Sequence, residues 1–219
     1  KITAIPHIFA RILRHQKTNL PCMDMTLFIA LLAFAFVSSV TPGPNNLMLL
    51  ASGANFGLRR TLPHMFGVSL GHSFMVFIVG LGLAQMFQAY PPLRQIMLVA
   101  SIAYMSWLAW KIAHASAPKQ GKVGGKPLTF FQAAAFQWVN PKGWIMAIGA
   151  QTNYAQDATW GAALMVGVGF VIVNFPAITL WAWLGQEMRR FLTNTRRLTA
   201  FNWTMAALLM ASLIPILFH

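Results

Sequence analysis

The sequence predicts an all-α, polytopic membrane protein. Of its 219 residues, 57% are hydrophobic and only 9% are charged. A soluble domain carries about 25% charged residues to cover its surface, so this chain has too little polar surface to face water on all sides. We therefore expect the lipid bilayer to be its solvent.

Long apolar runs recur along the chain and predict six membrane spans. A helix that crosses a bilayer needs about 20 mostly apolar residues. The predicted spans cover residues 25–55, 65–86, 93–112, 128–150, 158–184 and 198–218. The third is the least apolar, because Arg94 and Lys111 bracket it, but both side chains can reach the headgroups.

Residues 1–24 differ in character from the rest of the chain. Basic residues flank an apolar patch that is shorter than the core of a secretory signal. We expect a non-native leader in front of a start at Met23 or Met25, with an amphipathic interfacial segment as the alternative. The single cysteine, Cys22, lies in this stretch and cannot form an intramolecular disulfide or a thiolate metal site.

The basic charge lies almost wholly between the predicted spans. Lys and Arg residues follow the first, third and fifth spans, whereas the second and fourth connections are nearly free of them. The positive-inside rule therefore places the odd-numbered connections in the cytoplasm and both termini outside. Because orientation explains this alternation, we expect no nucleic-acid partner. Four tryptophans lie toward span ends, as in an interfacial belt: Trp160, Trp181, Trp183 and Trp203.

The connection over residues 113–127 is rich in Gly, Pro and Lys, which predicts a cytoplasmic linker. It divides a transporter domain over residues 25–218 into halves at about 25–112 and 128–218. Each half has three spans, an odd number, so the two halves must have opposite orientations. The sequence therefore predicts two inverted three-helix repeats, which are common in secondary transporters.

Proline motifs interrupt the first span of each half at corresponding depths. The motifs are TPGPN at residues 41–45 and NPKGW at residues 140–144. A proline frees the carbonyl four residues before it, so we expect unpaired carbonyls at Ser38, Val40 and Gln137. In a bilayer such breaks are tolerated only where protein, water or a solute supplies partners. Paired breaks therefore predict a transport site, whereas a lone proline such as Pro176 predicts only a kink.

Lys142 is the only cationic residue deep within a predicted span. A charge near the bilayer centre costs at least about 2.5 kcal/mol, so it marks a functional site by default. The spans contain no acidic residue, so we expect its partner to be a backbone carbonyl, an amide such as Asn45 or Gln137, or a solute carboxylate. The alternative is a lysine that reaches the headgroups or only caps freed carbonyls.

The second span contains two further features. His72 is the only deep group that titrates near neutrality, which makes it a candidate proton carrier, with a neutral packed imidazole as the alternative. Gly67 and Gly71 form a GxxxG step, for which close helix packing is the default interpretation.

Polar residues also lie within other predicted spans, such as Ser38 in the first and Asn174 in the fifth. We expect them either to line a hydrophilic path or to form hydrogen bonds between helices.

Four motifs together resemble the LysE/RhtB family of amino-acid exporters: TPGPNN at residues 41–46, GVSLG at 67–71, AYMSWLAWK at 103–111 and QWVNPKGW at 137–144. The resemblance covers residues 25–218. It implies six helices in two inverted halves, a bacterial inner-membrane location and export of neutral or basic amino acids, often driven by proton exchange. The TPGPNN form resembles the branch with cysteine and O-acetylserine exporters. Many relatives have Asp where this chain has Asn45, so an obvious proton-binding carboxylate is missing here.

We therefore predict an alternating-access exporter of neutral amino acids or derivatives, such as homoserine, threonine, cysteine or O-acetylserine. The predicted substrate-binding residues are Thr41, Pro42, Gly43, Pro44, Asn45, Gln137, Asn140, Pro141 and Lys142, and His72 is the candidate for proton coupling. The expected partners are a small amino-acid-like substrate and the lipid bilayer, and a homo-oligomer is left open.

Other functional classes fit the residues less well. A channel, or an exporter of another small zwitterionic or cationic solute, is the main alternative. We expect no enzyme activity, cofactor or metal, because the spans lack the carboxylates that a hydrolytic or metal site needs. An electron carrier that uses paired cysteines is excluded, because the spans contain none.

Overall fold

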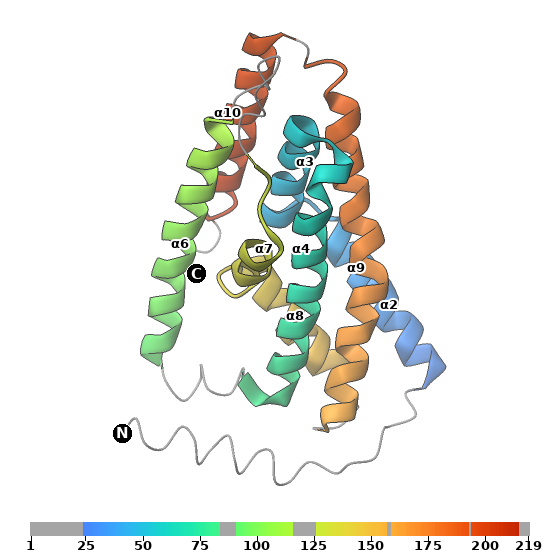
Figure 1. The fold of residues 1–219 in the computed structure, drawn as a ribbon. Coiled ribbons are helices and arrows are strands. Elements are labelled where there is room, and N and C mark those ends of the chain that lie inside the picture. The colour runs from blue at the N-terminus through green and yellow to red at the C-terminus, as the bar shows by residue number, and fades with distance from the viewer. Residues whose placement is uncertain (1–23, 84–90, 116–125, 157–158, 193, 215–219) are drawn as a thin grey trace.

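The protein is represented by a computed structural model that describes residues 24–83, 91–115, 126–156, 159–192 and 194–214 (Figure 1). Within these residues all regular structure is helical, which confirms the predicted all-α class. The chain order is α2 (Met25–Val40), α3 (Pro44–Phe56), α4 (Leu58–Ile78), the π-helical turn η1 (Val79–Leu83), α6 (Pro91–Ala113), α7 (Phe130–Gln137), α8 (Pro141–Tyr154), α9 (Trp160–Met188) and α10 (Thr195–Ala211). Most of the predicted leader and linker, and the ends of the second and sixth predicted spans, lie outside the described residues.

Side chains at the helix starts explain several boundaries. Asp24, Thr129, Thr159 and Asn194 each accept a hydrogen bond from a backbone N–H in the first turn of the helix that follows. Such caps satisfy amide groups that have no partner within the helix. At α7 the Gln132 side chain also accepts a hydrogen bond from the Thr129 N–H, which completes a capping box.

The described part of the chain contains three helices that are long and apolar enough to cross a membrane: Leu58–Leu83, Gln95–Ala113 and Trp160–Met188. The helices α2 and α3 count as a fourth span if the bent pair is one crossing. This is fewer than the six predicted spans. The difference lies in α7 and α8, which the second break shortens to 8 and 14 residues, and in α10, which has 17.

The first predicted span breaks at its proline motif. Helix α2 ends at Val40, α3 begins at Pro44, and the two axes differ by 58°. Pro44 takes the first position of α3, where a missing N–H costs nothing because that amide has no helical partner.

The second proline motif breaks the chain in the same way. Helix α7 ends at Gln137, and α8 begins with Pro141 after Asn140 as N-cap. Both proline motifs therefore start a new helix rather than kink an existing one. In contrast, α9 continues through Pro176.

The long helices α4 and α9 pack against each other, and each also packs on a broken pair (Figure 1). Helix α9 contacts α2 and α3, whereas α4 contacts α7 and α8. Helices α6 and α10 pack together beside this group. The two breaks are thereby held between α4 and α9.

Glycines allow the closest helix contacts. A Cβ atom on Gly53 of α3 would overlap the Ala182 carbonyl oxygen of α9, so these two backbones touch. On α4, a Cβ atom on Gly71 would lie 2.6 Å from the Ala134 Cα of α7, and one on Gly67 would overlap the Phe130 carbonyl oxygen. The close packing predicted for the GxxxG step is therefore confirmed.

Candidate functional site

The Lys142 side chain joins the two breaks. From the first turn of α8 its ammonium donates hydrogen bonds to the Thr41 carbonyl at 2.7 Å, the Thr41 Oγ1 at 2.8 Å and the Pro42 carbonyl at 3.3 Å. An ammonium has three N–H donors, and these three acceptors match that number. Thr41 and Pro42 are exposed, so the ammonium lies at the rim of the structure rather than sealed within it.

Gly43 makes room for this lysine. A Cβ atom at Gly43 would lie 2.7 Å from the Lys142 Cδ and 3.1 Å from its Nζ. Gly43 has an extended backbone with φ of −178°, which any residue can adopt. The site therefore requires glycine for space, not for backbone conformation.

A second link between the breaks is a reciprocal amide pair. Asn45 Nδ2 donates to Gln137 Oε1 at 2.8 Å, and Gln137 Nε2 donates to Asn45 Oδ1 at 3.1 Å. Gln137 is fully buried and also donates to the Ala133 carbonyl at 2.8 Å. Together with Lys142, this pair ties the first helix break to the second.

Each carbonyl that the prolines free has a partner within the protein. The Ser38 carbonyl accepts from Thr41 Oγ1 at 2.9 Å, and the Gln137 carbonyl accepts from the Asn140 N–H at 3.3 Å. The Val40 carbonyl accepts from the Trp181 indole N–H at 3.1 Å. The Trp181 indole N–H therefore lies at the first break, and its place in an interfacial belt stays a prediction.

Asn46 also supports the first break, although the predicted site residues do not include it. Its Nδ2 donates to the carbonyls of Ser39 and Thr41, both at 2.8 Å. The Thr41 carbonyl thus accepts from both Asn46 and Lys142. This carbonyl accepts two hydrogen bonds and holds both side chains at the first break.

A cavity lies where the two breaks meet. Its lining consists of Ser38, Ser39, Gly43, Asn45, Asn46, His72, Asn140, Lys142, Gly143, Met146, Asn174 and Ile178. Five predicted site residues therefore share it: Gly43, Asn45, His72, Asn140 and Lys142. The other five, Thr41, Pro42, Pro44, Gln137 and Pro141, are not part of the lining. They bind Lys142, pair with Asn45 or start the two half-helices.

Several polar atoms around this cavity have no hydrogen-bond partner among the described residues. They are Ser39 Oγ, Asn140 Oδ1 and both ring nitrogens of His72, and all three side chains are buried. Buried polar groups are normally paired, and each unpaired one costs about 1–3 kcal/mol. Their gathering beside one cation indicates a site for a small polar solute.

The His72 ring is held by packing. It lies edge-on to Phe170 with ring centroids 5.1 Å apart. A Cβ atom on Gly143 would lie 3.5 Å from His72 Nδ1, so the imidazole lies next to the first turn of α8. His72 thus lies close to the same half-helix as Lys142.

The donor set does not suit a metal ion. Among the described residues, no group of three His, Cys, Asp or Glu side chains is arranged to hold one. No carboxylate lines the cavity, and its only formal charge is the Lys142 ammonium. The chemistry of the site therefore favours a solute that brings its own anionic group.

Comparisons with known proteins identify the family. The family model described as LysE type translocator matches residues 36–213. The cysteine/O-acetylserine efflux protein of Klebsiella pneumoniae subsp. pneumoniae is 30% identical over 190 residues, which cover 85% of this chain and 95% of the relative. Proteins of the same name from Escherichia coli K12 and Shigella sonnei are 30% identical over 171 residues, 77% of this chain and 87% of theirs. No solved structure matches the chain. The chain belongs to the LysE type translocator family, an assignment that confirms the resemblance seen in its motifs.

Proposed function

We propose that this integral membrane protein is a secondary transporter that exports small neutral amino acids or their derivatives. The observation that carries the proposal is the Lys142 ammonium bound to the carbonyls of Thr41 and Pro42 beside a polar cavity. The relatives named above are cysteine/O-acetylserine efflux proteins. Cysteine and O-acetylserine each carry one ammonium and one carboxylate, which are the two groups that this site can bind.

The substrate ammonium takes the place of Lys142 at the first break. A primary ammonium already fits the Thr41 and Pro42 carbonyls and the Thr41 hydroxyl, so these acceptors also suit the α-ammonium of an amino acid. When the substrate takes these bonds, Lys142 turns to the substrate carboxylate. The zwitterion thereby exchanges one set of charged hydrogen bonds for another, and no ammonium is left without a partner.

The start of α8 adds to the carboxylate site. The first amides of a helix have no helical partner and carry a positive dipole end, which favours an anion. Lys142 and Gly143 lie in this first turn, so the carboxylate can meet both the ammonium and the backbone N–H groups. The unpaired atoms of Ser39, Asn140 and His72 are then available for the polar side chain of the substrate.

The proposed architecture is six spans in two inverted repeats, in the bacterial inner membrane. Three features support it: the paired breaks, the cross-packing of α4 and α9 on the broken pair of the other half, and the alternating basic connections. The bonds from Lys142 to Thr41 and between Asn45 and Gln137 join the two halves. Alternating access then requires these bonds to break and re-form as one half moves against the other.

His72 is the proposed site of proton coupling. Its buried ring lines the cavity and neither nitrogen has a partner among the described residues. Asn45 cannot carry a proton in the way a carboxylate can, so His72 is the lining residue whose side chain ordinarily titrates nearest neutrality.

Efflux from loaded cells tests the proposed function. Cells that express the protein are challenged with a panel of individual amino acids and analogues, and release is followed after loading. Compared with cells that lack the protein, we expect cells that express it to tolerate at least one neutral amino acid better and to release it faster. The variant Lys142→Ala, present in the membrane at the same amount, should give neither effect. If the protein changed neither tolerance nor release for any compound of the panel, the proposal would be overturned. An electrical current that does not saturate with solute concentration would indicate a channel.

A further inference from the structure

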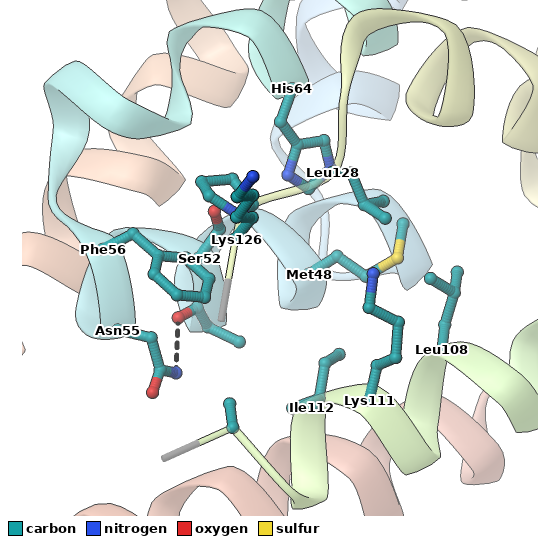
Figure 2. Close-up of a pocket in the computed structure, with 13 residues that line it drawn as sticks. Met48, Ser52, Asn55, Phe56, His64, Leu108, Lys111, Ile112, Lys126 and Leu128 are labelled. Atoms are coloured by element: carbon teal, nitrogen blue, oxygen red, sulfur yellow. Dashed lines mark hydrogen bonds between the residues drawn. The ribbon is translucent and has the colours of Figure 1, made fainter. Parts of the chain in front are cut away.

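A second cavity lies along α3, between α3, α4, α6 and the segment that leads into α7 (Figure 2). Apolar residues such as Met48, Leu108 and Leu128 form part of the wall, and three basic side chains complete it: His64, Lys111 and Lys126. Figure 2 shows the Lys111 side chain rising from α6 into this space, with His64 projecting from α4.

The basic groups of this cavity lack acidic partners. His64 is only 1% exposed, and neither of its ring nitrogens has a hydrogen-bond partner among the described residues. The Lys111 ammonium lies 4.8 Å from the centre of the Trp107 ring, a weak contact that leaves its N–H donors available. No Asp or Glu belongs to the lining.

The neutral polar residues of the wall are already paired. Ser52 shares a hydrogen bond of 2.9 Å with Thr61, and Asn55 donates to the Ala51 carbonyl at 2.8 Å. Asn55 also forms a reciprocal amide pair with Asn202, at 2.8 and 3.2 Å. The groups left to bind a solute are therefore the ammonium groups of Lys111 and Lys126 and the imidazole of His64, and the two ammonium groups select an anion such as a carboxylate.

We infer that this cavity is a second substrate site, which binds the carboxylate of the amino acid from the cytoplasm before it reaches Lys142. The inference rests on the proposed function. Lys111 and Lys126 flank the connection that the positive-inside rule places in the cytoplasm. The charges that orient the protein thereby also attract the anionic end of its substrate.

Helix α3 connects the two cavities. Asn45 lines the first cavity and Ser52 and Asn55 line the second, which places them about 10–15 Å apart along a helix. Residues 47–51 lie between them and are buried and apolar. A substrate therefore passes from one site to the other only when this apolar stretch moves relative to its neighbours, as alternating access requires.

The test compares two double variants that each remove two cytoplasmic positive charges. Lys111→Gln with Lys126→Gln removes the ammonium groups of the cavity, and Arg196→Gln with Arg197→Gln is the matched control at the start of α10. Initial efflux of labelled O-acetylserine is measured against its internal concentration. We expect the internal KM to rise at least about tenfold in the first variant, with the maximal rate kept, and to stay unchanged in the control.

Two further measurements test whether the change in KM comes from binding of the carboxylate in this cavity. The carboxamide of the substrate lacks the anionic group, so its internal KM should be equal in wild type and the lysine variant. His64→Phe removes the unpaired imidazole from the cavity wall without changing the charge of any connection. It should also raise the internal KM, which keeps the test open where the lysine variant fails to insert. An unchanged KM, or the same rise in the arginine control, overturns the inference while wild-type efflux still supports the proposed function. Absence of wild-type efflux would instead overturn the proposed function.

Discussion

Replacing Lys142 with alanine separates the two roles proposed for this side chain. In the structure its ammonium holds the Thr41 and Pro42 carbonyls with bonds of 2.7 and 3.3 Å, and the Thr41 hydroxyl with one of 2.8 Å. The substitution leaves these acceptors to the substrate ammonium. It also removes the partner of the substrate carboxylate.

The expected change in affinity follows from the hydrogen bond that is lost between Lys142 and the substrate carboxylate. A hydrogen bond to a charged group contributes about 1.5–3 kcal/mol, which corresponds to about 10- to 150-fold in affinity. Lys142→Ala should therefore lower the affinity for an amino acid, relative to the affinity for its decarboxylated amine, by at least about 10- to 150-fold. The decarboxylated amine loses no partner and no longer competes with the lysine, so its affinity should rise.

Equilibrium binding to the purified protein in lipid nanodiscs measures both effects. The matched control is Arg196→Ala, which removes a positive charge from the first turn of α10 and should leave both affinities unchanged. Equal weakening of the amino acid and the amine, or an unchanged ratio of their two affinities, would refute the exchange of ammonium groups at Thr41.

Three further predictions concern packing, pairing and coupling. Asn45→Leu leaves the buried Gln137 amide without its partner and should lower the free energy of unfolding by about 1–3 kcal/mol; adding Gln137→Leu should restore most of it, and purely additive losses in thermal unfolding would argue against the pair. Gly53→Ala drives a methyl group into the Ala182 carbonyl and should sharply reduce the yield of folded protein, whereas Gly149→Ala, with its nearest contact at 3.6 Å, should not; similar yields would contradict the contact between α3 and α9. His72→Gln should abolish the acceleration of export by an imposed pH gradient but keep exchange of labelled for unlabelled substrate, and a variant that still responds to the gradient would exclude His72 as the proton carrier.

Local sequence rules predicted the helix breaks well. A proline at the start of a helix needs no N–H partner, and both Pro44 and Pro141 take that position. The close approach at Gly67 and Gly71 likewise follows from residue size alone. These features depend on neighbours along the chain, which is why they can be read without a structure.

Contacts across long stretches of sequence were harder to predict. A backbone carbonyl was one of the expected partners of Lys142, but the choice of Thr41, 101 residues away, depends on how α8 packs beside the first break. The indole N–H of Trp181 likewise donates to the Val40 carbonyl, 141 residues away in the sequence, which no local pattern indicates.

Some lining residues carried only weak signals in the sequence. Asn46 follows directly after Asn45, and a second amide in the first turn after a proline break suggests a cap, but not that it serves the carbonyls of Ser39 and Thr41. From its place at the end of the third predicted span, Lys111 is expected to reach the lipid headgroups. Its place beside the buried His64 depends on how α6 packs near α4, which no local pattern specifies.

Counterflow in proteoliposomes tests most directly whether a zwitterionic amino acid is carried at the site where Lys142 meets Thr41. Purified protein is reconstituted with unlabelled O-acetylserine or cysteine inside, and uptake of the labelled compound is followed. We expect saturable exchange that small neutral amino acids inhibit and that falls sharply with Lys142→Ala at the same substrate concentration. Absence of exchange with every neutral amino acid, or a flux that rises without saturation and carries current, would contradict it.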